Sequence, residues 1–238
     1  MSPSAFISHC QKLLGQAYVL LDDQDKAPYL SDWRNRYQGK ALAILLPNTT
    51  AQVAEIVKAC NQAKISIVPQ GGNTSMCGAA TPNDSGQQVV MNLKRMQAIR
   101  GIDASNQTIV VEAGCILQTV QEAAKAQGFL FPLSLGAQGS CQIGGNLATN
   151  AGGTNVLRYG NARELCLGLE VVTAQGEVMQ GLRSLRKDNT GFDLRDLYIG
   201  SEGCLGIITA AVFKLYPLPT AQWTALVAVP DIPSTIDL

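Results

Sequence analysis

Apolar residues follow two spacings along the chain, one typical of helices and the other typical of strands. Recurrence every three or four residues predicts helices at 3–21, 49–64 and 117–127. Short apolar runs predict strands at 41–46, 65–68, 89–93, 99–102, 108–112, 167–173, 177–182 and 206–216. The strand, helix and strand between residues 41 and 68 suit a parallel β-α-β unit. A hairpin at 167–182 and a short helix or turn at 192–199 complete a mixed α+β pattern.

The pattern changes after Pro217 and Pro219. Residues 223–229 have the composition of a strand, and Asp231, Pro233 and Ser234 resemble a helix start. A helix that begins there and ends at residue 238 is expected to be too short to form. An isolated strand also cannot bury its own apolar face. We therefore expect a second domain to begin at about residue 220, with only its start in this chain.

Composition and charge exclude several classes of protein. Hydrophobic residues make up 46% of the chain, and 18 basic residues balance 18 acidic ones. A neutral chain without a run of like charge has no field that attracts nucleic acid or anionic membranes. No apolar stretch has the length of a transmembrane segment, and the N-terminus lacks the features of a secretory signal. The expected location is cytoplasmic.

Cysteine and histidine content argues against metal and disulfide sites. The seven cysteines are widely spaced without a C-x-x-C pair, so small packed thiols in a reducing compartment are favoured. A single histidine, His9, lies on the predicted N-terminal helix and excludes a multi-histidine metal site. No metal-ligating residue is assigned.

Glycine-rich segments at 71–75, 136–153 and 200–206 are the main candidates for chemistry. Glycine allows close approach of the backbone to a ligand, and successive N–H groups form an anion-binding concavity. The first segment contains no lysine or arginine, which suits a permanently bound diphosphate better than a transferring phosphoryl group. The P-loop pattern and the G-x-G-x-x-G fingerprint are both absent. Tight turns alone are the alternative, but long polar loops are entropically costly unless something orders them.

The glycine segments and a later run resemble a known flavoprotein family. The sequences PQGGNTSMCG (69–78), PLSLGAQGSCQIGGNLATNAGG (132–153), RYG (158–160) and SLRKDNTGFDLRDLYIGSEGCLGIIT (184–209) resemble the FAD domain of the vanillyl-alcohol oxidase/p-cresol methylhydroxylase (PCMH) superfamily. Within it, the last run is most similar to D-2-hydroxyglutarate dehydrogenase and its glycolate oxidase and D-lactate dehydrogenase relatives. The resemblance covers roughly residues 30–220.

The resemblance implies a PCMH-type FAD-binding fold in residues 1–218. Two α/β subdomains, about 1–98 and 99–218, would hold FAD between them, and residues 219–238 would begin a truncated substrate domain. The implied cofactor-binding residues are Pro69, Gln70, Gly71, Gly72, Asn73, Thr74, Ser75, Gly78, Pro132, Ser134, Gly136, Gly139, Ser140, Ile143, Gly144, Gly145, Asn146, Thr149, Asn150, Gly152, Gly153, Glu202, Gly203, Gly206 and Ile207. Some relatives attach flavin through a histidine after the Gly-Gly pair. This chain has Asn73 there, so noncovalent FAD is expected.

Oxidation of a 2-hydroxy acid needs a cation for the carboxylate, a base for the hydroxyl proton and flavin N5 for the hydride. In the resembled enzymes the base, the carboxylate-binding arginine and a histidine-bound metal belong to the C-terminal domain, so no catalytic residue is assigned here. The small-molecule substrate would bind through that missing domain, and the electron acceptor is unknown. For the cluster of Arg183, Arg186, Lys187 and Arg195, ion pairs with Asp188, Asp193 and Asp196 or solvated charge are favoured. The alternative is that Lys187 or Arg186 faces the flavin or a substrate carboxylate. The resemblance, rather than the spacing, implies that Arg34 and Arg36, beside Trp33, reach the site entrance.

The favoured function is the FAD-binding part of a dehydrogenase that oxidises D-2-hydroxy acids by hydride transfer to flavin N5. The alternatives are a flavin-binding subunit whose partner chain supplies the substrate domain, a flavin enzyme for another substrate class such as sugar lactones or UDP-sugars, and a flavin-independent binding or scaffold protein. A yellow protein with flavin absorbance separates the first three from the last.

Overall fold

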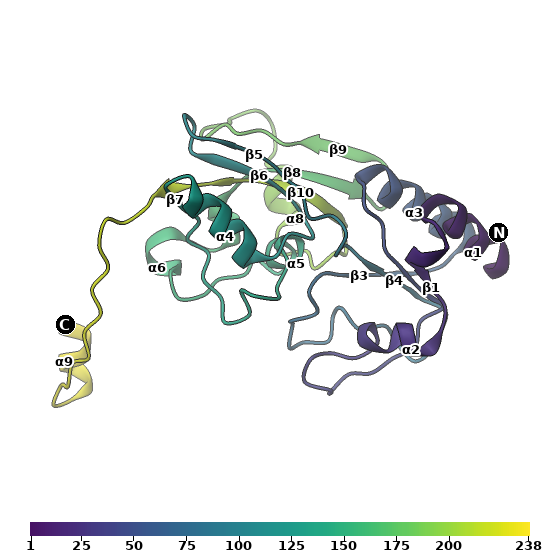
Figure 1. Ribbon diagram of the computed structural model, residues 1–238, viewed down its shortest axis with the longest axis horizontal. Coiled ribbons are helices and arrows are strands. Elements are labelled where there is room, and N and C mark those ends of the chain that lie inside the picture. The colour runs from purple at the N-terminus through teal and green to yellow at the C-terminus, as the bar shows by residue number, and fades with distance from the viewer.

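The computed structural model describes residues 1–238 and contains two main sheets side by side (Figure 1). The smaller sheet has the order β1-β2-β4-β3, with bounds Val19–Leu20, Ala43–Leu45, Val89–Asn92 and Ile67–Gln70. Strands β2 and β3 both pair with β4 in parallel, whereas β1 pairs with β2 antiparallel. Helix α3 (Thr50–Ala63) connects β2 to β3 and thus forms the predicted β-α-β unit.

Local sequence explains where α3 begins and ends. The side chain of Thr49 accepts a hydrogen bond from the Gln52 N–H at 3.2 Å, and Lys64 ends the helix in a left-handed conformation with φ 58°. The buried face of α3 packs with α1 (Pro3–Leu14) against the smaller sheet. On the way to β2 the chain also forms α2 (Asp23–Lys26) and two 3-10 turns (Gln16–Tyr18 and Ala27–Tyr29).

The larger sheet is antiparallel throughout and has the order β5-β6-β10-β8-β9. Its strands span Ile99–Asp103, Thr108–Glu112, Gly206–Lys214, Cys166–Thr173 and Val178–Gly181. The helices on this side of the molecule are α4 (Leu117–Ala126), α5 (Ile143–Ala148), α6 (Val156–Tyr159), α7 (Ala162–Leu165) and α8 (Leu194–Tyr198). A short pair, β7 (Phe129–Leu130) with β11 (Tyr216–Pro217), lies beyond α4. Phe131 and Phe213 are among the fully buried residues of this core.

A buried polar cluster connects the two halves. Glu170 on β8 is only 5% exposed, and its Oε1 accepts hydrogen bonds from the hydroxyls of Thr50 at 2.6 Å and Thr209 at 2.9 Å. Arg100 on β5 pairs with Glu170 at 3.2 Å and with Glu112 at 3.1 Å. Because Thr50 belongs to the first turn of α3, this cluster links the smaller half to four strands of the larger sheet.

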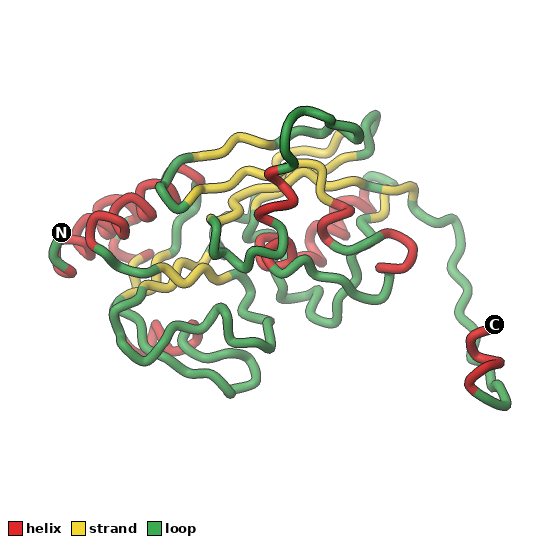
Figure 2. The backbone as a smooth tube through the Cα atoms, turned by 180° about the vertical axis from the view of Figure 1, so that it is seen from behind, coloured by secondary structure: helices red, strands yellow, loops and turns green.

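The tail after β11 differs from the sequence prediction. The strand predicted at 223–229 is wrong, because no neighbouring strand supplies hydrogen-bond partners and the segment is extended and exposed. The expectation that a helix starting near residue 231 could not form is also wrong. Helix α9 spans Ile232–Asp237, and its N-cap Asp231 accepts a hydrogen bond from the Ser234 N–H at 2.9 Å. Figure 2 shows this helix away from the rest of the molecule.

Other helices and strands begin or end a few residues from the predicted positions. The first helix ends at Leu14, because Gly15 leaves helical geometry with φ 90°. Strand β3 begins and ends two residues later than predicted, so Pro69 and Gln70 belong to the strand rather than to the glycine loop. Helices α5, α6 and α7 were not predicted, because they are too short to show a periodic pattern. The helix at 49–64, the strands of the larger sheet and the hairpin at 167–182 are confirmed.

Candidate functional site

Backbone contacts bring the three glycine-rich segments together. A Cβ on Gly72 would lie 2.1 Å from the carbonyl oxygen of Ser140, so only glycine allows the first segment to approach the second this closely. The N–H groups of Gly200 and Glu202 donate to the carbonyls of Leu147 at 3.0 Å and Ala148 at 2.9 Å. The third segment therefore rests on the end of α5, directly behind the second.

Each of these segments also holds one non-glycine residue in the left-handed region. The φ angles are 52° at Asn73, 46° at Asn150 and 51° at Glu202. Such backbone is costly, especially for glutamate, and it persists only where the surrounding structure imposes it. The Asn150 Oδ1 accepts a hydrogen bond from the Arg163 N–H at 3.0 Å, which holds this turn in place.

The first segment presents a row of backbone donors without partners. None of the N–H groups of residues 71–76 donates a hydrogen bond within the chain. The nitrogen of Gly145, which also donates to nothing, lies 3.7 Å from the position of a Cβ on Gly71. A row of backbone N–H groups without partners in the protein can donate to an acceptor-rich ligand.

Two buried acceptors next to these donors are also unpaired. Gln142 and Asn146 are 7% and 5% exposed, and their Oε1 and Oδ1 atoms have no hydrogen-bond partner. The Gln142 Oε1 lies 3.5 Å from the position of a Cβ on Gly71. A Cβ on Gly136 or Gly145 would meet open space, in contrast to Gly72. Orphaned polar atoms and an open glycine surface fit a ligand that carries both donors and acceptors.

Several residues of the predicted set serve the protein itself. Gln70 is buried, and its amide donates to the carbonyls of Tyr29 at 3.0 Å and Ala80 at 2.9 Å. Ile143 and Ile207 are core residues, and the Gly144 N–H donates to the Ala113 carbonyl at 2.7 Å. A Cβ on Gly206 would meet the Val172 carbonyl at 2.7 Å, so this glycine serves strand packing. The side chains of Gln70 and Ile143 are thus engaged within the protein.

The remaining predicted residues lie around the same loops. Ser134 pairs with Gly153 as an isolated bridge, and the Thr149 hydroxyl donates to the Gly145 carbonyl at 2.9 Å. A pocket of about 460 Å³ opens beside this region, with Pro69, Gly203, Cys204 and Ile207 in its lining.

Sequence reasoning missed the role of Asp32. This residue is 2% exposed, and its carboxylate accepts backbone hydrogen bonds from Arg34, Arg36 and Tyr37. Those bonds, first the one from Tyr37, hold the pKa of Asp32 below its ordinary value despite the opposing effect of burial. The run S-D-W-R-N-R is a signal for such a turn, because aspartate side chains often bond to backbone two residues ahead.

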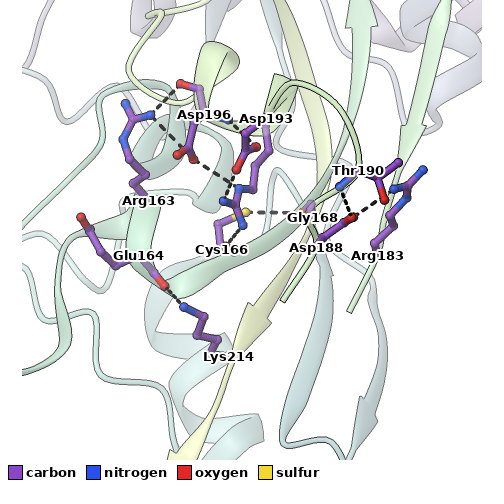
Figure 3. A network of polar contacts seen from close by, with 11 residues as sticks. Arg163, Glu164, Cys166, Gly168, Arg183, Asp188, Thr190, Asp193, Asp196 and Lys214 are labelled. Carbon is purple, nitrogen blue, oxygen red and sulfur yellow. Dashed lines mark hydrogen bonds and ion pairs between the residues drawn. The ribbon is translucent and has the colours of Figure 1, made fainter. Parts of the chain in front are cut away.

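Two of the four basic residues at 183–195 pair with carboxylates, as interpreted from the sequence (Figure 3), whereas Arg186 and Lys187 form no ion pair. Arg183 pairs with Asp188 at 2.9 Å, and Arg195 pairs with Asp193 at 2.5 Å and Asp196 at 3.2 Å. Hydrogen bonds from Arg183 and Thr190 lower the pKa of Asp188. Arg186 donates to the Asn106 carbonyl at 2.8 Å.

The fold and the converging amide-lined loops define an α+β ligand-binding domain whose binding surface is mostly backbone. The family model described as "FAD binding domain" matches residues 41–181, more than half of the chain. The chain therefore belongs to the family of FAD-binding domains.

Curated relatives and solved structures agree with this assignment. The chain is 41% identical over 225 residues to "D-2-hydroxyglutarate dehydrogenase, mitochondrial" of Arabidopsis thaliana, an alignment that covers 94% of this chain and 40% of the relative. The Bos taurus enzyme of the same name is 43% identical, with 89% and 39% covered, and a putative mitochondrial D-lactate dehydrogenase of Schizosaccharomyces pombe is 41% identical, with 93% and 43% covered. The chain thus spans about 40% of the length of these relatives.

Two solved structures have the same fold. Alkyldihydroxyacetonephosphate synthase superposes with a TM-score of 0.82 at 22% identity, covering 92% of this chain and 41% of that one. p-Cresol methylhydroxylase with substrate bound gives 0.76 at 25% identity, with 92% and 44% covered. The resemblance to the PCMH superfamily and to its D-2-hydroxy acid dehydrogenases is confirmed, as is the PCMH-type fold.

The expected cytoplasmic location is contradicted. The relatives from Arabidopsis thaliana, Bos taurus and Schizosaccharomyces pombe are all named as mitochondrial proteins, which the neutral composition did not indicate. None of the helices has both the length and the apolar character needed to cross a bilayer.

Proposed function

We propose that the cleft between the glycine segments binds FAD noncovalently, with the diphosphate at residues 71–76. The observation that carries this proposal is the row of unpaired N–H groups in that segment. The half-buried hydroxyls of Thr74 and Ser75 add further donors. In this proposal Gly136, Gly139, Ser140 and Gly145 would line the flavin part of the ligand, and Thr149–Gly153 would lie near its ribityl or adenine part.

The pocket of about 460 Å³ is proposed to receive the adenosine half of the dinucleotide. Pro69 and Gly203 lie in contact at its wall, where a Cβ on Gly203 would be 2.9 Å from the Pro69 Cγ. This pocket adjoins β3, the strand that leads directly into residues 71–76. This adjacency supports the proposal that one extended ligand occupies the pocket and the amide-lined segment together.

Noncovalent binding is supported by the side chains near the cleft. Asn73 carries an amide, which is not a nucleophile, and its Nδ2 donates to the Ser31 carbonyl at 2.7 Å. Release of all flavin on denaturation in acid would agree with this proposal, and retained flavin would place a covalent bond at exposed Cys77 or Cys204.

For the whole protein we propose oxidation of a D-2-hydroxy acid. When bound, FAD supplies the hydride acceptor. The residues described here bind and orient it, while groups for the substrate carboxylate and hydroxyl proton would come from a further domain or a partner chain. The relatives named above, about 2.5 times longer than the aligned region, support this division. We accordingly propose subdomains at about 1–98 and 99–218, followed by the start of a substrate domain at 219–238.

The decisive experiment is FAD titration of Gly145→Ala beside a control. Alanine in a helix is more favourable than glycine by about 0.5–1 kcal/mol, so stability should stay equal or rise. The added methyl would enter the open space at the cleft, so FAD affinity should fall by about tenfold or more. Gly101→Ala, with equally open surroundings on β5, should leave affinity unchanged. Equal affinities for all three proteins would contradict the proposed placement.

A wild-type protein that stays colourless and shows no thermal shift with FAD would instead favour a flavin-independent binding or scaffold protein. Turnover that appears only after a partner chain is added would favour a flavin-binding subunit. Reduction of the bound flavin by a sugar lactone rather than by D-2-hydroxyglutarate or D-lactate would indicate the other substrate class.

A further inference from the structure

The hairpin 31–38 is built around one buried carboxylate. Ser31 and Gln38 close it as an antiparallel bridge, and Asp32 is inside it. The Asp32 Oδ1 accepts the N–H groups of Arg36 and Tyr37, both at 2.7 Å, and Oδ2 accepts that of Arg34 at 3.3 Å. These charge-assisted bonds fix the backbone from which two arginine side chains extend.

The same hairpin contacts the amide-lined segment at Asn73 and the chain just beyond that segment at Gly78. The Asn73 Nδ2 donates to the Ser31 carbonyl at 2.7 Å. Tyr37 lies against Gly78, where a Cβ would be 2.5 Å from the ring. Between these contacts, the Arg34 Nη1 lies 3.7 Å from the Met76 Sδ. Arg34 is thus placed beside the last of the unpaired N–H groups.

Five arginines form no ion pair. Arg95 and Arg186 donate to backbone carbonyls and Arg158 lies over the Tyr159 ring, which leaves Arg34 and Arg36. Both are exposed, and neither forms an ion pair. The cations of Arg100, Arg163, Arg183 and Arg195 are all paired with carboxylates. Lys94, another cation near the smaller sheet, bonds to the hydroxyl of Tyr29 and lies over its ring at 5.0 Å.

A diphosphate held by residues 71–76 would receive hydrogen bonds there but no positive charge, because that segment has no basic residue. We infer that the Arg34 guanidinium supplies this charge and donates to a phosphate oxygen of the dinucleotide. The contact with Met76 is a weak hydrogen bond to sulfur, so its loss would cost little. This inference rests on the proposed function, since it assigns a cation to the same bound dinucleotide.

The test is FAD affinity of the purified chain at low and high salt for Arg34→Met, which keeps an unbranched side chain. We expect a loss of about tenfold at low salt that shrinks to about twofold at high salt, because screening removes the charge contribution. Arg34→Lys should recover most of the affinity. Arg36→Met is the matched control, with the same hairpin and exposure but no contact to residues 71–76, and should change affinity by less than about twofold.

The outcomes separate this inference from the proposed function. A loss that is equal at both salt concentrations would show that Arg34 shapes the loop rather than supplying charge, and would overturn the inference. Unchanged affinity in Arg34→Met would overturn it as well. If the wild-type chain fails to bind FAD at any salt concentration, the proposed function fails first.

Discussion

Residues 71–76 and residues 183–196 are both loops with conspicuous sequences, yet their polar groups are in opposite states. The first loop has no charged side chain, and its N–H groups find no partner in the chain. The second is dense in charge, but Arg183, Asp188, Asp193 and Arg195 pair with each other or with their neighbours. We therefore expect a ligand to bind at the loop with unpaired donors rather than at the loop with the higher density of charge.

The physical reason lies in what each loop gains from binding. An N–H group without a partner in the protein can donate to an anionic ligand without breaking any bond within the chain, whereas a donor that a ligand buried but left unpaired would cost about 1–3 kcal/mol. A paired arginine would have to give up a carboxylate before it could bind another, and an exposed pair gains little either way. Changes in the first loop should therefore affect the ligand, and changes in the paired networks should affect stability.

The largest effect is expected from Gly72→Ala. Its Cβ would lie 2.1 Å from the Ser140 carbonyl, so the first and second glycine segments must separate. FAD affinity should fall by about 100-fold or more, with a loss of stability of about 1–3 kcal/mol. Fluorescence titration with FAD and urea unfolding measure the two effects.

Gly71→Ala is the matched control for this change. Its Cβ would lie 3.5 Å from Gln142, an ordinary contact distance. We expect a loss in affinity at least about tenfold smaller than for Gly72→Ala. Similar losses in both variants would mean that glycine is needed for backbone freedom along the loop rather than for contact with Ser140.

The next effect concerns the buried cluster around Glu170. Glu170→Gln keeps the shape but removes the charge that Thr50, Arg100 and Thr209 satisfy. We expect a loss of about 2 kcal/mol in the free energy of unfolding at pH 7, with FAD affinity changed much less than by Gly72→Ala. An unaltered unfolding midpoint would contradict the view that this cluster holds the two halves together.

The pH dependence of the same variant provides a second readout. Burial raises the pKa of Glu170, but hydrogen bonds from Thr50, Arg100 and Thr209 outweigh it and leave the pKa below 4.5. A lowered pKa in the folded state contributes stability above the unfolded pKa, and this stability is lost as pH falls through the folded pKa. The difference between wild type and Glu170→Gln should therefore be constant above about pH 5.5 and shrink as pH falls below 4.5.

Much of the fold was predictable because its strands and long helices carry their own periodicity. Helix α3 is a clear case, since Thr49 and Lys64 mark both ends and its apolar face repeats regularly. The strand predicted at 223–229 does not form, because strand-like composition is not sufficient. A strand also needs a neighbouring strand to pair with, and none lies beside this segment. Helices α5 to α7 are held by contacts such as the capping box of Asn161 and Glu164, which a periodicity search does not detect.

The candidate site was predictable to the level of segments but not of side chains. Glycine and asparagine marked 71–75, 136–153 and 200–206, since these residues permit unusual backbone. Whether Gln70 faces a ligand or bonds to Tyr29 depends on contacts between residues 41 positions apart. The role of Asp32 depends likewise on the hairpin 31–38, which contacts Asn73 and Gly78 more than 40 residues further along the chain.

The smallest effect is expected where the charges are already paired. Arg183→Gln removes the 2.9 Å pair with Asp188 on a side chain that is 58% exposed. Its charge is already balanced by Asp188, and Arg183 is not among the residues proposed to bind FAD. FAD affinity should therefore stay within about twofold and the melting temperature within about 2 °C. A loss of affinity that matches that of Arg34→Met would show that the density of charge in this loop does serve the ligand. The contrast between paired and unpaired loops would then have to be abandoned, because the Arg183 side chain could bind a ligand only by leaving Asp188.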